Sequence, residues 1–159
     1  MKDLTWLSDP EPAKSPDEAT PAEMPIILLG DAGGGGDSET VEVSANRVYY
    51  YCEVDRHQAL KFNKALESLE KKILANAISL DTNPANIYAH INSFGGSVFA
   101  GLSSVDYIKK SKVPVHTIID GCAASAATLM SVVGEHRQMH HHSFMLIHQL
   151  SSVMWGKYE

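Results

Sequence analysis

The stretch Asp120–Ala127, DGCAASAA, decides the fold because it joins a strand pattern to a helix pattern at a single serine. The apolar run Val113–Ile119 predicts a buried strand, and the residues after it open a helical pattern that Gly134 closes. We therefore expect Ser125 in the first helical turn, where backbone N–H groups are unpaired. Its hydroxyl could attack a carbonyl while the Ala126 amide stabilises the oxyanion. It could also simply cap the helix, and the stretch alone favours that interpretation.

Two further segments favour a catalytic role for Ser125 over a capping role. Ile91–Val98, INSFGGSV, places paired glycines between a strand pattern and a helical one, and such glycines let the backbone turn sharply with exposed N–H groups. Phe144–Gln149, FMLIHQ, is an apolar strand pattern that delivers His148 at its end. A serine needs a neighbouring base to become a nucleophile, and histidine is suited to that role near neutral pH. Serine, histidine and backbone donors together are most of an acyl-transfer site.

Three motifs carry a family resemblance. The segments Ile91–Val98, Gly121–Ala127 and Leu146–Gln149 resemble, in order and approximate spacing, motifs of the proteolytic subunit of the Clp protease. Those motifs read I-N-S-P-G-G-S/V-V/I, G-x-A-A-S and M-I-H-Q. The resemblance runs from about Val48 to the C-terminus. It implies a serine peptidase with the ClpP/crotonase-like α/β fold, in which repeated β-α-β units surround a mainly parallel sheet.

The resemblance assigns roles to individual residues. Ser125 would be the nucleophile and His148 the general base. The backbone amides of Gly96 and Ala126 would form the oxyanion hole, and a Cβ at Gly96 would be an obstruction. An extended substrate would pair, as an added strand does, with the backbone at Gly95, Gly96, Val98 and Leu150. Neither a metal nor a cofactor is expected for this chemistry.

Three departures from the family pattern bear on activity. Phe94 replaces the usual proline, and the interval from Ser125 to His148 is shortened, as in the Clp-related head-maturation proteases of bacteriophages. The catalytic Asp of the family follows well after the His, but this sequence has no Asp after Asp120 and ends at Glu159. We therefore expect the N-terminal part of a longer protein. It would lack the interface helix called the handle and the third triad residue, and would have weak or no activity.

These features predict an ATP-dependent Clp-type serine endopeptidase subunit that hydrolyses unfolded polypeptides through an acyl-enzyme. The alternatives are a phage head-maturation protease and a catalytically silent ring subunit. The resemblance implies a heptameric homo-oligomer, with an AAA+ unfoldase as a further partner. The docking groove for that unfoldase would keep an aromatic at Tyr88 but carry the polar His90 and Lys110. Polar residues weaken an apolar groove, which favours an altered partner or the phage role.

Composition limits the remaining classes of function. The 159 residues, 44% of them hydrophobic, suit one domain with a real core, and a net charge of −6 argues against nucleic acid as a partner. No apolar run predicts a membrane span and no signal peptide is apparent, so we expect a cytoplasmic location. The two cysteines form no disulfide framework, and Cys122 is expected to be a buried filler rather than a thiol nucleophile. Ser97 is assigned to turn geometry, and His140–His142 to a surface turn rather than a metal site.

The chain divides near Thr40. Residues 1–40 are acidic and rich in Pro and Gly, which predicts a flexible arm. Within the arm, Met24–Leu29 could form a strand, and Gly30–Gly36 is interpreted as a linker because no Lys follows its glycines as in a phosphate loop. Residues 41–159 alternate strand and helix patterns and form the expected head domain.

The head pattern predicts where each element begins and which side it buries. Strands are expected over Arg47–Val54 and Ile87–Ile91, and a helix capped by Asp55, with Gln58 completing a capping box, should end near Asn76. The apolar faces expected in the core are Phe62, Leu66, Leu69 and Ile73 on the first helix, Leu102, Val105 and Ile108 on the second, and Leu129, Val132 and Val133 on the third. The glycine turn and Ser125 would then lie at the carboxyl ends of neighbouring parallel strands, where α/β sheets place their sites.

Overall fold

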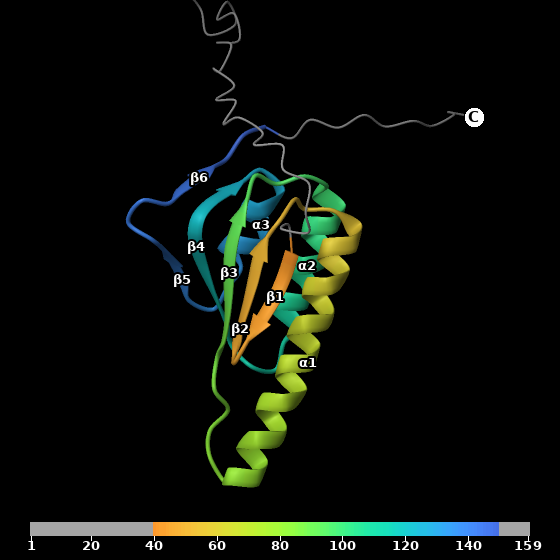
Figure 1. The fold of residues 1–159 in the computed structure, drawn as a ribbon, viewed down its shortest axis with the longest axis vertical. Helices are drawn as coiled ribbons and strands as arrows, with labels where there is room; N and C mark the ends of the chain where they lie inside the picture. The colour runs from red at the N-terminus through yellow and green to blue at the C-terminus, as the bar shows by residue number, and fades with distance from the viewer. Residues whose placement is uncertain (1–39, 150–159) are drawn as a thin grey trace, which may run out of the picture. The chain divides into compact units, whose positions relative to one another are not determined.

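The computed structural model describes residues 40–149, so the expected strand at Met24–Leu29, the linker Gly30–Gly36 and the position Leu150 lie outside the described residues. Within this range strands alternate with helices along the chain (Figure 1). The elements are β1 (Thr40–Ser44), β2 (Arg47–Tyr51), α1 (Arg56–Leu80), β3 (Ile87–Ser93), α2 (Val98–Lys110), β4 (Val115–Ala124), α3 (Ala126–Val132), β5 (Arg137–Met139) and β6 (Phe144–Leu146).

The strands form one sheet in which only the first described pairing is antiparallel. The order is β1-β2-β3-β4-β5, with β1 antiparallel to β2 and each later pair parallel. β6 also pairs with β4 in parallel, further along that strand than β5. The carboxyl ends of β3 and β4 therefore lie at one edge of the sheet, which is the upper edge in Figure 1. This arrangement confirms the predicted α/β fold with a mainly parallel sheet.

β1 is a strand that the sequence patterns do not predict. It pairs with β2 along its whole length, so the boundary expected near Thr40 falls at the start of a strand. The two residues between β1 and β2 are Ala45 and Asn46, without the glycine that usually signals a tight hairpin. Ala45 nevertheless adopts the left-handed conformation, with φ 55°. The turn is therefore made by residues that give no clear turn signal.

α1 agrees with the sequence pattern except at its end. Its first turn is capped by Asp55, whose carboxylate accepts a hydrogen bond from the Gln58 amide at 2.7 Å, as predicted. The helix runs to Leu80, about one turn beyond the expected end at Asn76, and Asp81 ends it in the left-handed conformation. The predicted apolar face is buried in full: Phe62, Leu66, Leu69 and Ile73.

α2 and α3 bury different faces from those predicted. Ile108 is buried as expected, but Leu102 and Val132 are exposed. Val105, Leu129 and Val133 are only half-buried. The two helices contact each other and bury mostly small side chains, namely Ala100, Gly101 and Ser104 on α2 and Ala126, Ala127, Thr128, Met130 and Ser131 on α3. Apolar periodicity misses such faces because Gly, Ser and Thr do not contribute to it.

Candidate functional site

Ser125 lies on a sharper turn than the sequence predicts. β4 continues past the expected end at Ile119 to Ala124, and α3 starts only at Ala126, so Ser125 precedes the helix instead of lying in its first turn. It has φ 51° and ψ −122°, a conformation that side-chain-bearing residues adopt at a cost of roughly 1–3 kcal/mol. Its side chain makes no capping hydrogen bond, so the simple N-cap interpretation is wrong. We call residues 124–126 the serine turn.

The glycine turn, residues 94–97, follows β3 and leans against the serine turn. Gly95 has φ 99°, and a Cβ there would lie 2.6 Å from Ala124 O and 2.7 Å from Ser125 Cβ. Its amide donates to the buried Ser93 hydroxyl at 3.2 Å. Glycine at this position is therefore required both by conformation and by the closeness of the two turns.

Gly96 is held from the other side by Val54, which lies between β2 and α1. Val54 N donates to Gly95 O at 2.7 Å, and Ser97 N donates to Val54 O at 2.6 Å. With φ 142°, Gly96 would direct a Cβ to within 2.5 Å of Val54 O. The obstruction expected at Gly96 is thus backbone of the same chain. Ser97 caps α2 through a bond from the Ala100 amide at 3.4 Å, as its assignment to turn geometry predicts.

Two backbone N–H groups at these turns have no acceptor. Among residues 40–149, neither Gly96 N nor Ala126 N donates a hydrogen bond. The amide of Ser125 is already used, since it donates to Leu146 O at 3.0 Å. Gly96 N and Ala126 N are therefore unpaired donors at the turns. An oxyanion could accept hydrogen bonds from both of them.

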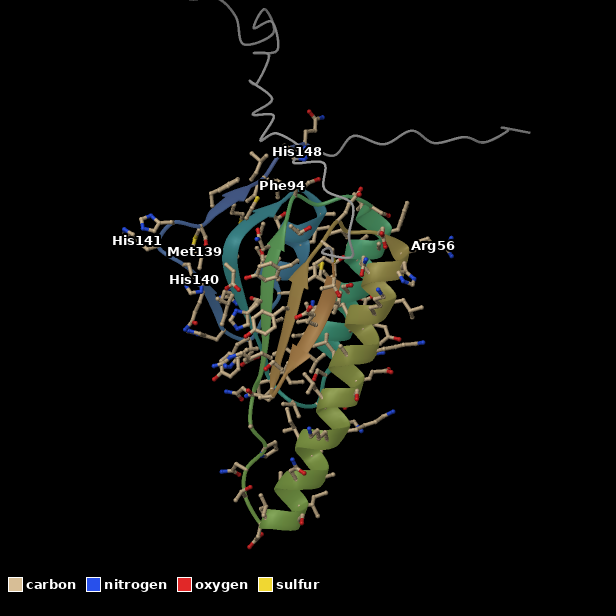
Figure 2. The ribbon with its side chains drawn as sticks, viewed as in Figure 1. Arg56, Phe94, Met139, His140, His141 and His148 are labelled. Atoms are coloured by element: carbon tan, nitrogen blue, oxygen red, sulfur yellow. The ribbon has the colours of Figure 1, made fainter. Side chains whose placement is uncertain are left out.

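His148 reaches the site from β6. The bond from Ser125 N to Leu146 O ties the end of β6 to the serine turn, and His148 follows two residues later. Its imidazole is exposed, with Nδ1 2.8 Å from Gln149 O. Among residues 40–149 no carboxylate contacts this imidazole, and no hydrogen bond joins it to Ser125. Figure 2 shows His148 at the same end of the sheet as Phe94, the first residue of the glycine turn.

A cavity of about 310 Å³ joins residues from three separate segments at this end of the sheet. Of the predicted site residues it brings together Val98, Ser125, Ala126 and His148. The other lining residues, which the sequence did not predict at the site, are Leu102, Thr128, Leu129 and Ile147. The sequence pattern predicted Leu102 and Leu129 in the core instead. The exposure of Leu102 and the partial exposure of Leu129 are explained by this cavity, whose walls are mostly apolar.

Cys122 is not part of this cavity. It is 3% exposed, and burial raises the pKa of its thiol, which disfavours the reactive thiolate. Its amide donates to Asn92 Oδ1 at 3.1 Å. The side chain therefore behaves as the predicted buried filler. Cys52 is also buried.

A second polar cluster lies on the half-exposed face of the sheet and centres on Asp120. Its carboxylate accepts a hydrogen bond from Tyr51 OH at 2.6 Å and lies 2.9 Å from His90 Nδ1. His140 Nε2 is 3.1 Å from the same carboxylate. Sequence reasoning found no partner for His90, because the partner is supplied by a neighbouring strand. Burial, followed by the bond to Asp120, raises the pKa of Tyr51 above its ordinary value. We call these four side chains the Asp120 cluster.

Residues 40–149 contain neither a cluster of metal ligands nor a membrane-spanning helix. No group of three His, Cys, Asp or Glu side chains is arranged to hold a metal ion, and His140–His142 are exposed. Figure 2 shows His140 and His141 on the flank of the sheet formed by β5 and the segment after it. In the same part of the chain no helix is long and apolar enough to cross a membrane.

Comparison with known proteins gives a consistent result. A family model described as Clp protease matches residues 43–159. The ATP-dependent Clp protease proteolytic subunits of Leuconostoc citreum and Streptococcus mutans are 41% and 40% identical over 87 residues, covering 52% of this chain and 44% of each relative. The chain thus spans less than half the length of these curated relatives.

The fold comparison agrees with the family match. A solved structure of a ClpP1 mutant from Listeria monocytogenes superposes with a TM-score of 0.54 and 27% sequence identity, over 64% of this chain and 56% of that one. The family model spans both strand-to-helix turns and the segment that carries His148. The chain therefore belongs to the Clp protease family.

Proposed function

We propose that this protein is a serine endopeptidase subunit in which Ser125 is the nucleophile and His148 the general base. The observation that carries the proposal is the serine turn. Ser125 adopts an unfavourable backbone conformation, and its hydroxyl caps nothing. A serine used only for structure would be expected to cap the helix or to be replaced by glycine. The same residue opens into an apolar cavity that His148 also lines.

The chemistry follows the general pattern of acyl transfer. Ser125 Oγ attacks the peptide carbonyl carbon and its proton passes to His148, which returns it to the leaving amine. With Nδ1 donating to Gln149 O, Nε2 carries the lone pair needed for that transfer. The negative charge on the carbonyl oxygen is stabilised by Gly96 N and Ala126 N. The orienting carboxylate of the triad is expected to come from outside residues 40–149.

Substrate binding is proposed along the glycine turn and in the cavity. An extended polypeptide would pair with the backbone at Gly95, Gly96, Val98 and Leu150. The side chain preceding the cleaved bond would enter the cavity between Leu102 and Ile147, which favours apolar residues there. This assignment predicts preferential cleavage after large apolar side chains of unfolded chains.

The assembly and partners are further proposals. Residues 41–159 would form the head of a homo-oligomeric ring, in the cytoplasm. The relatives are named ATP-dependent, and an AAA+ unfoldase is proposed as the partner from the family resemblance. The Asp120 cluster includes His90, which is near the expected docking position Tyr88. Because polar side chains weaken an apolar docking groove, the cluster favours instead the second candidate, a head-maturation protease that needs no ATP. Sedimentation velocity tests the ring, because a chain that stays monomeric at micromolar concentration contradicts it.

Active-site labelling tests the chemistry. A fluorophosphonate probe should modify the full-length protein, which includes the orienting carboxylate, at Ser125, and Ser125→Ala should abolish the modification. Cys122→Ala is the matched control, since it removes the neighbouring candidate nucleophile, the thiol of Cys122 on β4. This variant should label normally. Labelling that survives in Ser125→Ala, or that disappears in Cys122→Ala, contradicts the assignment. A wild-type protein that never labels supports the catalytically silent subunit.

A further inference from the structure

β4 carries an irregularity just before the serine turn. Its pairing with β3 sets Ile91 opposite Ile119 but Ser93 opposite Ala123. Residues 120–122 of β4 therefore face only Asn92 of β3. On the other side, β5 pairs with β4 up to Ile119 and β6 begins to pair only at Cys122. Such a bulge removes regular ladder bonds and re-aims the strand that follows.

The Asn92 side chain fills the gap that this bulge leaves. Its Oδ1 accepts a hydrogen bond from Cys122 N at 3.1 Å, which replaces a backbone partner with a side-chain one. The amide group also lies against Gly121, because a Cβ on Gly121 would be 2.9 Å from Asn92 Oδ1 and 3.2 Å from Cγ. The bulge residue and the asparagine are thus sterically matched.

The residues beyond the bulge lead directly to the site. From Cys122 to Ala124 the strand is buried and paired with β6, and the next backbone bond joins Ser125 N to Leu146 O. A change in the path of β4 at residues 120–122 would shift both the serine turn and its connection to the segment carrying His148. β3 and β4 are adjacent at this edge in Figure 1.

We propose that Asn92 is a positioning residue for catalysis, whose side-chain oxygen holds the β4 bulge so that Ser125 meets His148 and the two free amides. Asn92 itself does not line the cavity and would not touch the substrate. Displacements of about 1 Å in a reacting group cost on the order of a hundredfold in rate. The proposal rests on the proposed role of Ser125. The effect of Asn92 on the backbone of β4 can nevertheless be measured without any activity.

The test compares three variants by amide hydrogen exchange and by the rate of fluorophosphonate labelling. Asn92→Leu keeps the size of the side chain and removes the acceptor, whereas Asn92→Asp keeps an acceptor oxygen. Asn46→Ala is the matched control, because it removes another bond between an Asn side chain and the backbone, from Asn46 Nδ2 to Asn86 O at 2.8 Å. That bond lies at the opposite ends of β2 and β3.

In Asn92→Leu we expect the amides of Cys122 and Ser125 to exchange at least about tenfold faster and labelling to slow by roughly ten- to a hundredfold. Asn92→Asp should stay within a few-fold of wild type in both measurements, and Asn46→Ala should change neither amide. Unchanged exchange in Asn92→Leu, or an Asp variant as impaired as the Leu variant, overturns the proposal. If Asn92→Leu does not fold, Gly121→Ala displaces the same amide group and must reproduce the loss. Absence of labelling in wild type refutes the role of Ser125 alone, because the exchange data still decide the role of Asn92.

Discussion

The glycine turn and the serine turn solve the same geometric problem with different residues. Each takes the chain from the carboxyl end of a parallel strand into a helix, and each passes through positive φ. The glycine turn uses Gly95 and Gly96, which adopt such angles without cost. The serine turn uses Ser125, which does not. The proposed role of Ser125 as nucleophile predicts this difference, because the serine turn must keep a side chain that the glycine turn has no room for.

The two turns also differ in what surrounds them. The glycine turn is tied by backbone bonds to Val54 and lies against Ala124 and Ser125. The serine turn is joined to β6 by the pairing of Ala124 with Leu146 and by the bond from Ser125 N to Leu146 O, and it opens into the cavity. The glycine turn is therefore a rigid support, whereas the serine turn exposes the Ser125 side chain to the cavity. The variants below test this division, beginning with the largest expected effect.

Removing the base should abolish the reactivity of the serine turn. We expect His148→Ala to lower the rate of fluorophosphonate labelling by roughly a thousandfold or more, because the hydroxyl then has no proton acceptor. The exposed side chain supports no core contact, so the thermal midpoint should not move. His141→Ala, another exposed histidine, is the control and should label normally. Equal labelling in the two variants would contradict the assignment of the base.

Adding a methyl group should disrupt the glycine turn. Gly95→Ala would bring Cβ to 2.6 Å from Ala124 O in a backbone conformation with φ 99°, so we expect it to destabilise the fold by about 3 kcal/mol or more. Ser97→Ala, at the end of the same turn, should cost only about 1 kcal/mol through the lost cap. Urea unfolding measures both. A Gly95→Ala protein within 1 kcal/mol of wild type would show that the turn is not a rigid support.

Sequence patterns predicted the parts of this architecture that depend on one element at a time. The face of α1, its cap at Asp55 and the strand β3 follow from periodicity and local hydrogen bonding, and all three are confirmed. The motifs around Ser125 and His148 lie at one cavity, as the order of parallel strands leads one to expect. Their catalytic roles remain a proposal.

What the sequence did not predict depends on contacts between elements. The strand β1 is stabilised by its pairing with β2, since its own residues and the Ala45–Asn46 turn give little signal. Leu102 has the spacing of a core residue, yet α2 packs on α3 through smaller side chains and leaves Leu102 at the cavity. The partner of His90 is on β4, far away in sequence. Periodicity within one helix or strand carries no information on such pairings.

The strain in the serine turn can be measured by substituting the serine itself. Ser125→Gly should be more stable than Ser125→Ala by about 1 kcal/mol, because glycine accepts φ 51° and ψ −122° whereas alanine keeps the unfavourable conformation. Both variants should fail to label. Urea unfolding of the two proteins gives the difference directly. If alanine is as stable as glycine, the backbone at Ser125 is not strained, and the two turns do not differ in conformational cost.

The smallest expected effect concerns the Asp120 cluster, which lies on β4 close to the serine turn. In the folded protein the pKa of Tyr51 is raised by burial and by its bond to Asp120. The contribution of this phenol to stability is thus fully present below its unfolded pKa of about 10 and is lost as the pH rises from there toward the folded pKa. Tyr51→Phe removes the titrating group, so its stability should fall less steeply with pH than that of wild type.

Unfolding by urea between pH 8 and pH 11 tests this expectation. Because Tyr51 is partly exposed, solvent weakens the bond to Asp120 and the difference between the two proteins should be small. Tyr50, whose pKa is also raised by burial, contributes equally to both proteins and cancels in the comparison. Labelling at pH 8 should be nearly unchanged in Tyr51→Phe, because Asp120 keeps its contacts with His90 and His140. Parallel stability curves would show that folding does not raise the pKa of Tyr51 and that the Tyr51–Asp120 bond does not stabilise the folded protein.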